Sequence, residues 1–185
     1  NDRRAPEIDS RFLENHAEGL ILLSGCRKGE VASLVESGHF KEAEIILKHY
    51  LECFGTDNVY VELQNNLVYG DTERNRNLVG LSRKLEISTV ATNNVHYHIR
   101  ERHQLQDCLV AIKQLKRLEE CHRERRANSE FYLKSPQKMV ALFQDYPEAI
   151  SNTLNIANRC AGFDLTRDLK YQFPESSIPK GFTQE

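Results

Sequence analysis

The chain has 185 residues, of which 39% are hydrophobic and 28% are charged, and its formal net charge is −2 with an isoelectric point near 6.4. This length favours one domain or part of a larger one, with enough apolar residues to form a core. The charge excludes a protein whose surface is generally basic for nucleic-acid binding. No apolar run approaches the roughly 18 residues of a membrane-spanning helix, so we expect no membrane association.

The N-terminus and the cysteines indicate whether the chain was cut and in which cellular compartment it occurs. Residues 1–4 lack an initiator Met and the apolar stretch of a signal peptide, so we interpret this terminus as a cut end. The five cysteines are widely spaced, odd in number and form no CxxC pair. This pattern argues against a disulfide framework or a zinc ribbon and favours reduced thiols in the cytoplasm.

The first half of the chain alternates between strand and helix patterns. Short apolar or β-branched runs predict strands, and apolar residues at helical spacing predict helices. The predicted elements are strand 19–24, helices 29–36 and 39–54, strand 59–63, helix 71–85 and strand 87–92. The continuous apolar run at 19–24 is typical of a strand that is buried on both faces. The alternation predicts βαβ units, and therefore an α/β fold with a parallel sheet.

The second half is predicted to be helical. Residues 100–113 carry an apolar stripe, and the dense charges of 116–128 predict an exposed connector. Ser135 as N-cap and Pro136 in the first turn predict the start of a helix. A last helix is predicted over 147–160, and together the two form a helical hairpin.

Candidate chemistry lies where the predicted strands end, because parallel α/β folds bind ligands beyond the carboxyl ends of their strands. His96 and His98 follow the third strand and, in an extended segment, would face the same side as two metal ligands could. Polar loop residues are the commoner interpretation of such a pair. Cys26 ends the first strand, where a thiolate could bind a divalent metal, although a free cysteine is more often a small buried residue.

Other motifs give weaker signals. The sequence has no Walker loop, no GxGxxG and no GxSxG elbow. The basic run 123–126 could contact nucleic acid, but a solvated loop explains such runs more often. Tyr60, Phe131 and Tyr132 are interpreted as packing residues rather than as platforms for base stacking.

Several segments together resemble the PHP (polymerase and histidinol phosphatase) domain of bacterial DNA polymerase III alpha subunits. They occur in the family's order from about residue 18 to the end. The matching segments are 18–31, which contains Ser24-Gly25-Cys26, then 59–64, 90–97 (VATNNVHY), 130–136 (EFYLKSP) and 147–160.

The resemblance implies the C-terminal part of a PHP-type distorted (βα)7 barrel, followed by a small helical extension, with a metal cluster at the strand tips. It places Cys26, Asn94 and His96 at metal positions. Asn94 stands where the family usually has an aspartate, and an uncharged amide is a poorer metal ligand than a carboxylate. We therefore expect a divalent metal (Zn, Mn or Mg) at a site that is incomplete in this chain. The segment 93–107 resembles the error-prone, damage-tolerant branch of the family.

The resulting domain division has five parts. They are a polar lead-in (1–18), the C-terminal part of the PHP barrel (19–115), a charged connector (116–129), a helical hairpin leading towards the palm (130–162) and a tail or linker (163–185).

The resemblance implies a fragment of a DNA-directed DNA polymerase acting in replication or repair synthesis, with no catalytic residue of its own and inactive alone. The expected partners are the rest of the polymerase chain, DNA through the parent protein, and replication or repair proteins. Three strands cannot close a barrel, so self-association through open sheet edges is also expected. Two alternatives stay open: a stand-alone PHP metal-dependent phosphoesterase, and a non-catalytic protein-interaction module.

Overall fold

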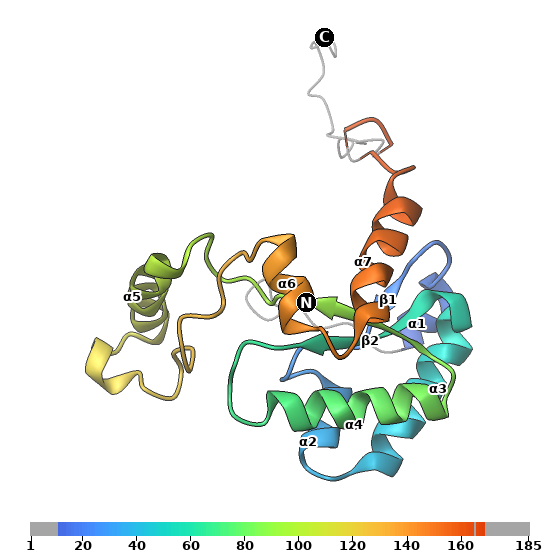
Figure 1. Cartoon of the computed structure of the whole chain (residues 1–185), viewed down its shortest axis with the longest axis horizontal. Helices are drawn as coiled ribbons and strands as arrows, with labels where there is room; N and C mark the ends of the chain where they lie inside the picture. The colour runs from blue at the N-terminus through green and yellow to red at the C-terminus, as the bar shows by residue number, and fades with distance from the viewer. Residues whose placement is uncertain (1–10, 165, 169–185) are drawn as a thin grey trace, which may run out of the picture.

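A computed structural model describes residues 11–164 and 166–168 (Figure 1). The start of the polar lead-in and most of the tail lie outside the described residues. In chain order the elements are α1 (Arg11–His16), β1 (Leu22–Leu23), α2 (Glu30–Glu36), α3 (Phe40–Phe54), η1 (Thr56–Asn58), β2 (Val59–Gln64), α4 (Asp71–Lys84), β3 (Ser88–Thr92), η2 (Arg100–Arg102), α5 (His103–Gln114), η3 (Leu118–Glu120), α6 (Pro136–Leu142) and α7 (Pro147–Cys160).

The three strands form one parallel sheet in the order β1-β2-β3. Leu22 pairs with Val59, and the register between β2 and β3 runs from Tyr60–Ser88 to Gln64–Thr92. The predicted α/β fold with a parallel sheet is therefore confirmed. Within the described residues the sheet is open, so a closed seven-stranded barrel is not part of this structure.

The strand predicted at 19–24 is shorter and more exposed than its apolar sequence indicates. Only Leu22 and Leu23 form β1, and Leu23 is 37% exposed. The prediction of burial on both faces is wrong for this strand, because β1 is an edge strand and pairs with β2 alone among the described residues. The strand that does fit the buried pattern is β2, which lies in the middle of the sheet.

Helices cover both faces of the sheet. In Figure 1, α2, α3 and α4 lie below it, and α6 and α7 lie above. The core joins these layers: Val61 and Leu63 of β2, Leu47 of α3 and Phe143, just after α6, belong to one cluster of buried hydrophobic residues. Asn152 of α7 fixes the upper layer, because its Nδ2 donates a 2.9 Å hydrogen bond to the Thr89 carbonyl of β3.

The helix α5 projects away from the sheet (Figure 1). Its predicted apolar stripe exists, but Leu105 and Leu109 are half exposed and Ile112 is 68% exposed. Among the described residues, none of the helices is both long and apolar enough to cross a membrane.

The connector after α5 is mostly exposed, but some of its residues are held against the rest of the chain. Cys121 is completely buried, and Arg125 is half-buried through an ion pair with Asp107 of α5 at 3.1 Å. The reason is that the connector folds back towards the strand ends, where Arg125 forms its ion pair. All five cysteines lie within the described residues, and none of them is paired in a disulfide there.

Candidate strand-end pocket

The carboxyl ends of the three strands open onto one pocket of about 340 Å³. The structure places Cys26, Asn94 and His96 together in its lining, with residues from the β2 end, α4 and the connector. Their co-location follows from the topology, because parallel strands bring their carboxyl ends to one edge of the sheet. Their role as metal ligands stays a prediction.

A tight turn presents Cys26 at the end of β1. Gly25 has a positive φ of +92°, which favours glycine, and the Gly29 N–H donates to the Cys26 carbonyl at 2.7 Å. A Cβ on Gly29 would lie 2.9 Å from that carbonyl oxygen. Glycine is therefore required at position 29 for the chain to close so tightly under Cys26.

Asn94 lies in a left-handed turn after β3, with a φ of +46°. Asparagine tolerates this conformation better than most residues. The preceding residue anchors the turn: the Asn93 side chain donates to the Tyr132 carbonyl at 2.7 Å, and Asn66 donates to the Asn93 carbonyl at 3.1 Å. The turn redirects the chain so that His96 can reach the pocket.

His96 is held by the segment that leads into α6. Its backbone N–H donates to the Phe131 carbonyl at 2.8 Å, and its ring meets the Phe131 ring edge-on at 5.9 Å between centroids. Burial lowers the pKa of the His96 imidazole, and the charge of Arg126 lowers it further. His98 is exposed and lies outside this pocket, in a neighbouring hollow that His96 also lines.

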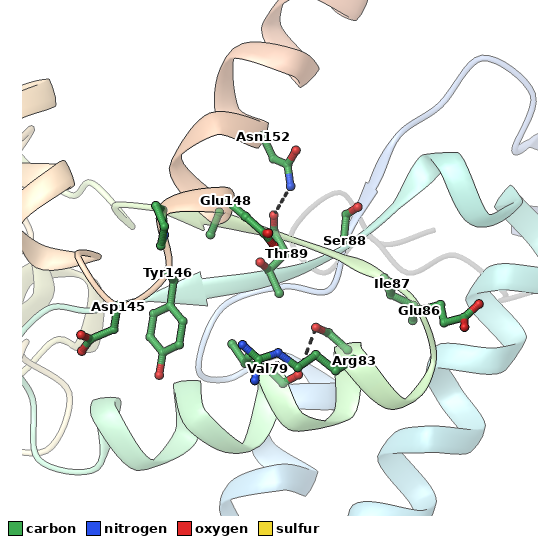
Figure 2. A pocket seen from close by; sticks show the side chains of 13 residues that line it. Val79, Arg83, Glu86, Ile87, Ser88, Thr89, Asp145, Tyr146, Glu148 and Asn152 are labelled. Atoms are coloured by element: carbon green, nitrogen blue, oxygen red, sulfur yellow. Dashed lines mark hydrogen bonds between the residues drawn. The ribbon is translucent and has the colours of Figure 1, made fainter.

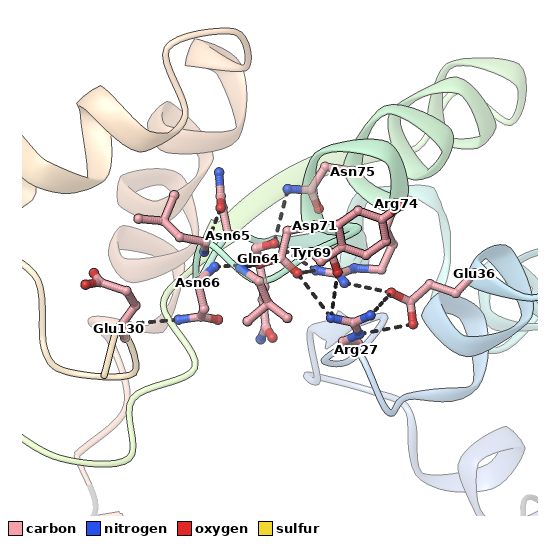
Figure 3. Close-up of polar contacts among 12 residues, drawn as sticks. Arg27, Glu36, Gln64, Asn65, Asn66, Tyr69, Asp71, Arg74, Asn75 and Glu130 are labelled. Carbon is pink, nitrogen blue, oxygen red and sulfur yellow. Dashed lines mark hydrogen bonds and ion pairs between the residues drawn. The ribbon is translucent and has the colours of Figure 1, made fainter. Parts of the chain in front are cut away.

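A partly buried charge network supports one wall of the pocket (Figure 3). Arg74 is only 3% exposed and donates to Asp71 at 2.8 Å, to Glu36 at 3.0 Å and to the Gln64 carbonyl at 3.0 Å. Arg27, next to Cys26, forms a second ion pair with Glu36 at 2.9 Å. The network ties the end of β1 to the end of β2 through α2 and α4.

Asp71 also organises the loop after β2. Its Oδ2 accepts hydrogen bonds from the backbone N–H groups of Asn66 at 2.8 Å and Val68 at 3.0 Å. Sequence reasoning placed Asp71 only at the start of a helix. Its position in the first turn of α4 was the available signal, because carboxylates there commonly accept backbone N–H groups.

The basic connector, for which the sequence predicts a solvated loop, also lines the pocket. The guanidinium of Arg126 lies 5.2 Å from the centroid of the Phe131 ring, and Arg123 and Arg125 also line the pocket. The alternating charges of the connector do not predict that it folds back against the pocket. This position depends on partners in other elements, such as Asp107 of α5.

The described residues do not fit a complete metal centre. No group of three or more His, Cys, Asp or Glu side chains within the described ranges is arranged to hold a metal ion. Cys26 and His96 supply two good donor atoms, Asn94 supplies a neutral amide, and arginines surround them.

A second hollow of about 340 Å³ lies at the other end of β3 (Figure 2). Residues near the end of α4, the start of β3 and the start of α7 line it, among them Arg83, Glu86, Asp145 and Glu148. None of the predicted site residues lies here. It is a polar seam where α7 meets the sheet, held by the bond from Asn152 to Thr89.

Comparison with known proteins gives one family and a consistent set of relatives. The family profile described as "PHP domain" matches residues 1–66. Over 185 aligned residues the chain is 37% identical to a protein of Symbiobacterium thermophilum named error-prone DNA polymerase, with 98% of this chain and 17% of that protein covered.

Two further relatives carry the name DNA polymerase III subunit alpha. The chain is 39% identical to that of Treponema pallidum, covering 84% of this chain and 13% of the relative. It is 34% identical to that of Pseudomonas aeruginosa, covering 94% and 15%. The chain thus spans 13 to 17% of the length of these curated relatives.

Proposed function

We propose that this chain, which belongs to the PHP-domain region of the bacterial DNA polymerase III alpha family, is part of a DNA-directed DNA polymerase. The parent protein would add deoxynucleoside monophosphates to a primer end during replication or repair synthesis in the cytoplasm. The observation that carries this proposal is the similarity at 37% identity across 98% of the chain.

The contribution of this chain is structural. Its described residues offer no complete metal centre, whereas nucleotide transfer uses metal ions held by a set of carboxylates. The described residues instead form a rigid support, because the ion pairs among Arg27, Glu36, Asp71 and Arg74 hold the strand ends in place. The proposed partners are the remaining polymerase chain, DNA through the parent, and replication or repair proteins.

The pocket of Cys26, Asn94 and His96 is the proposed remnant, or part, of the family's metal site. The gathering of all three residues at one pocket supports this assignment. If the missing ligands come from another part of the parent protein, a divalent ion would supply Lewis-acid chemistry there. Within this chain the residues only position donor atoms at the strand ends.

Membership of the error-prone branch is the finer form of the proposal. The segment 93–107 resembles this branch, and a relative named error-prone DNA polymerase is 37% identical over 98% of the chain. A fidelity assay on the complete polymerase tests this assignment. Misincorporation at the level of a proofreading-competent replicase would remove the chain from this branch.

The test of the main proposal is to express the complete reading frame that contains this segment and to measure primer extension. We expect template-directed incorporation of deoxynucleotides. A reading frame that stops shortly after Glu185 and hydrolyses phosphate esters would instead establish the stand-alone phosphoesterase. A frame with neither activity that still binds a replication protein would establish the interaction module.

A further inference from the structure

A second cationic site lies on the far side of the segment that carries Phe131. This segment runs beside the chain that follows β3: Tyr97 and Tyr132 form an isolated parallel bridge, and the Leu133 N–H donates to the Tyr97 carbonyl at 3.1 Å. Side chains alternate in such an extended segment. Phe131 therefore lines the strand-end pocket, whereas Tyr132 lines a separate groove of about 440 Å³.

Three cations gather around the Tyr132 ring in this groove. The ammonium of Lys134 lies 4.6 Å from the ring centroid, and the charged groups of Arg100 and Lys138 each lie 5.2 Å from it. Lys138 also donates to the phenolic oxygen at 3.2 Å. The ring thus acts as the floor on which three positive side chains converge.

Only one carboxylate opposes these three cations in the groove lining. Glu130 lies 2.5 Å from Arg100 and 3.9 Å from Lys134. Three positive charges against one negative charge leave a local excess of two. Like charges held this close repel one another, and an anion between them would relieve the repulsion.

The two outer cations keep donors available for such an anion. The Arg100 side chain is 53% exposed, and Lys138 is also exposed. A guanidinium carries five N–H groups and an ammonium three, so one ion pair and one hydrogen bond leave most of them unused. Lys134 is the opposite case: its side chain is 1% exposed, and it donates to Asn93 at 3.2 Å and to the Glu130 carbonyl.

We propose that the Tyr132 groove binds a phosphate-class oxyanion between Arg100 and Lys138, with buried Lys134 supplying a fixed positive charge beneath it. Arginine forms paired hydrogen bonds to tetrahedral oxyanions, and lysine adds a point charge. This site does not depend on the proposed polymerase activity. Its ligand could be free phosphate or the phosphodiester of a nucleic-acid strand, which share this chemistry.

The test is calorimetric titration of the purified chain with inorganic phosphate and, separately, with a short single-stranded oligothymidylate at the same ionic strength. Arg100→Gln and Lys138→Gln each remove one exposed cation, and each is expected to weaken binding by about tenfold or more. Lys41→Gln removes an equally exposed cation from α3 and is the matched control. Glu130→Gln removes the competing carboxylate and is expected to strengthen binding.

Substitutions of the exposed residues Arg100, Lys138 and Lys41 should leave the core unchanged, and circular dichroism verifies that each variant is folded. A loss of binding can then be assigned to the removed charge. Phosphate binding alone identifies a free phosphate, and oligothymidylate binding with the same variant pattern identifies a phosphodiester. The proposal is overturned if neither probe binds saturably. It is equally overturned if Lys41→Gln weakens binding as much as Arg100→Gln does.

Discussion

The guanidinium of Arg74 lies 2.8 Å from the carboxylate of Asp71, and the two side chains are only 3% and 5% exposed. The pair is one turn apart on α4, yet it joins the helix to the end of β2, because Arg74 also donates to the Gln64 carbonyl. Removing one member of a buried ion pair leaves the other charge without compensation. The stability of the strand-end pocket should therefore depend on both residues.

Replacing Arg74 by Met tests this dependence. We expect the free energy of unfolding to fall by about 3 kcal/mol, since Asp71 would remain buried and charged with only the backbone N–H groups of Asn66 and Val68 and the more distant Arg27 as partners. Urea denaturation measures the change. Arg76→Met is the control, because Arg76 lies on the same helix but is exposed, and its loss should cost less than about 0.5 kcal/mol. Equal losses in both variants would contradict the assigned role of the network.

Glycine substitutions test the turn that presents Cys26. Gly29→Ala should destabilise the protein by about 1–3 kcal/mol, because the new Cβ would meet the Cys26 carbonyl oxygen at 2.9 Å. Gly80→Ala should have the opposite sign, stabilising α4 by about 0.5–1 kcal/mol, since a Cβ there meets nothing within 4 Å. Thermal unfolding followed by circular dichroism compares the two. A stabilising Gly29→Ala would mean that the turn is wider than described.

The ionisation of Tyr132 provides a test by pH. The hydrogen bond and charge of Lys138, together with a smaller contribution from Arg100, lower the pKa of the Tyr132 phenol, although burial opposes this. A phenol whose folded pKa is depressed contributes stability above its unfolded pKa, near 10, and loses it as the pH falls through the folded value. The effect is therefore confined to alkaline solution.

Absorbance of tyrosinate at 295 nm during an alkaline titration measures this pKa. Tyr132→Phe should remove the early part of the titration, while Lys138→Met should move it to higher pH. Burial raises the pKa of Tyr50 and of Tyr97, so these residues should titrate late in every variant. An unchanged early phase in Tyr132→Phe would show that another tyrosine is responsible.

Chelation tests whether a metal stabilises this chain. Since no group of three or more His, Cys, Asp or Glu side chains among the described residues is arranged to hold a metal ion, we expect the thermal midpoint to stay constant when EDTA is added. Added Zn²⁺ or Mn²⁺ should likewise shift it little, because a ligand stabilises only in proportion to its binding of the folded state. A fall of several degrees on chelation, abolished in His96→Ala, would instead establish a metal at the strand ends.

Self-association through the sheet edge stays a prediction of the sequence, and the structure suggests where to probe it. Leu23 of β1 is 37% exposed on a strand that pairs only with β2 among the described residues. We expect dimers or larger species by light scattering at high concentration, and Leu23→Lys should shift the distribution towards monomer, because edge charges oppose strand pairing. A monomeric mass over a wide concentration range would rule this out.

The order of strands and helices, and the strand tips where Cys26 and His96 lie, can be predicted from the amino-acid sequence alone. The spacing of apolar residues and the length of each apolar run are local properties, so short stretches of chain predict the strands and helices. Parallel strands bring their carboxyl ends to one edge of the sheet, which places the strand tips together. The Ser135 N-cap is of the same kind, and its Oγ accepts a hydrogen bond from the Lys138 N–H.

The surroundings of those strand tips depend on how the whole chain folds. Leu23 is exposed because β1 pairs only with β2 among the described residues. Arg125 is half-buried through Asp107 of α5, and Arg100 reaches the Tyr132 ring from a distant segment of the chain. The sequence does not distinguish a charged side chain that is solvated from one that forms an ion pair. Burial and pairing become defined only when the chain has folded.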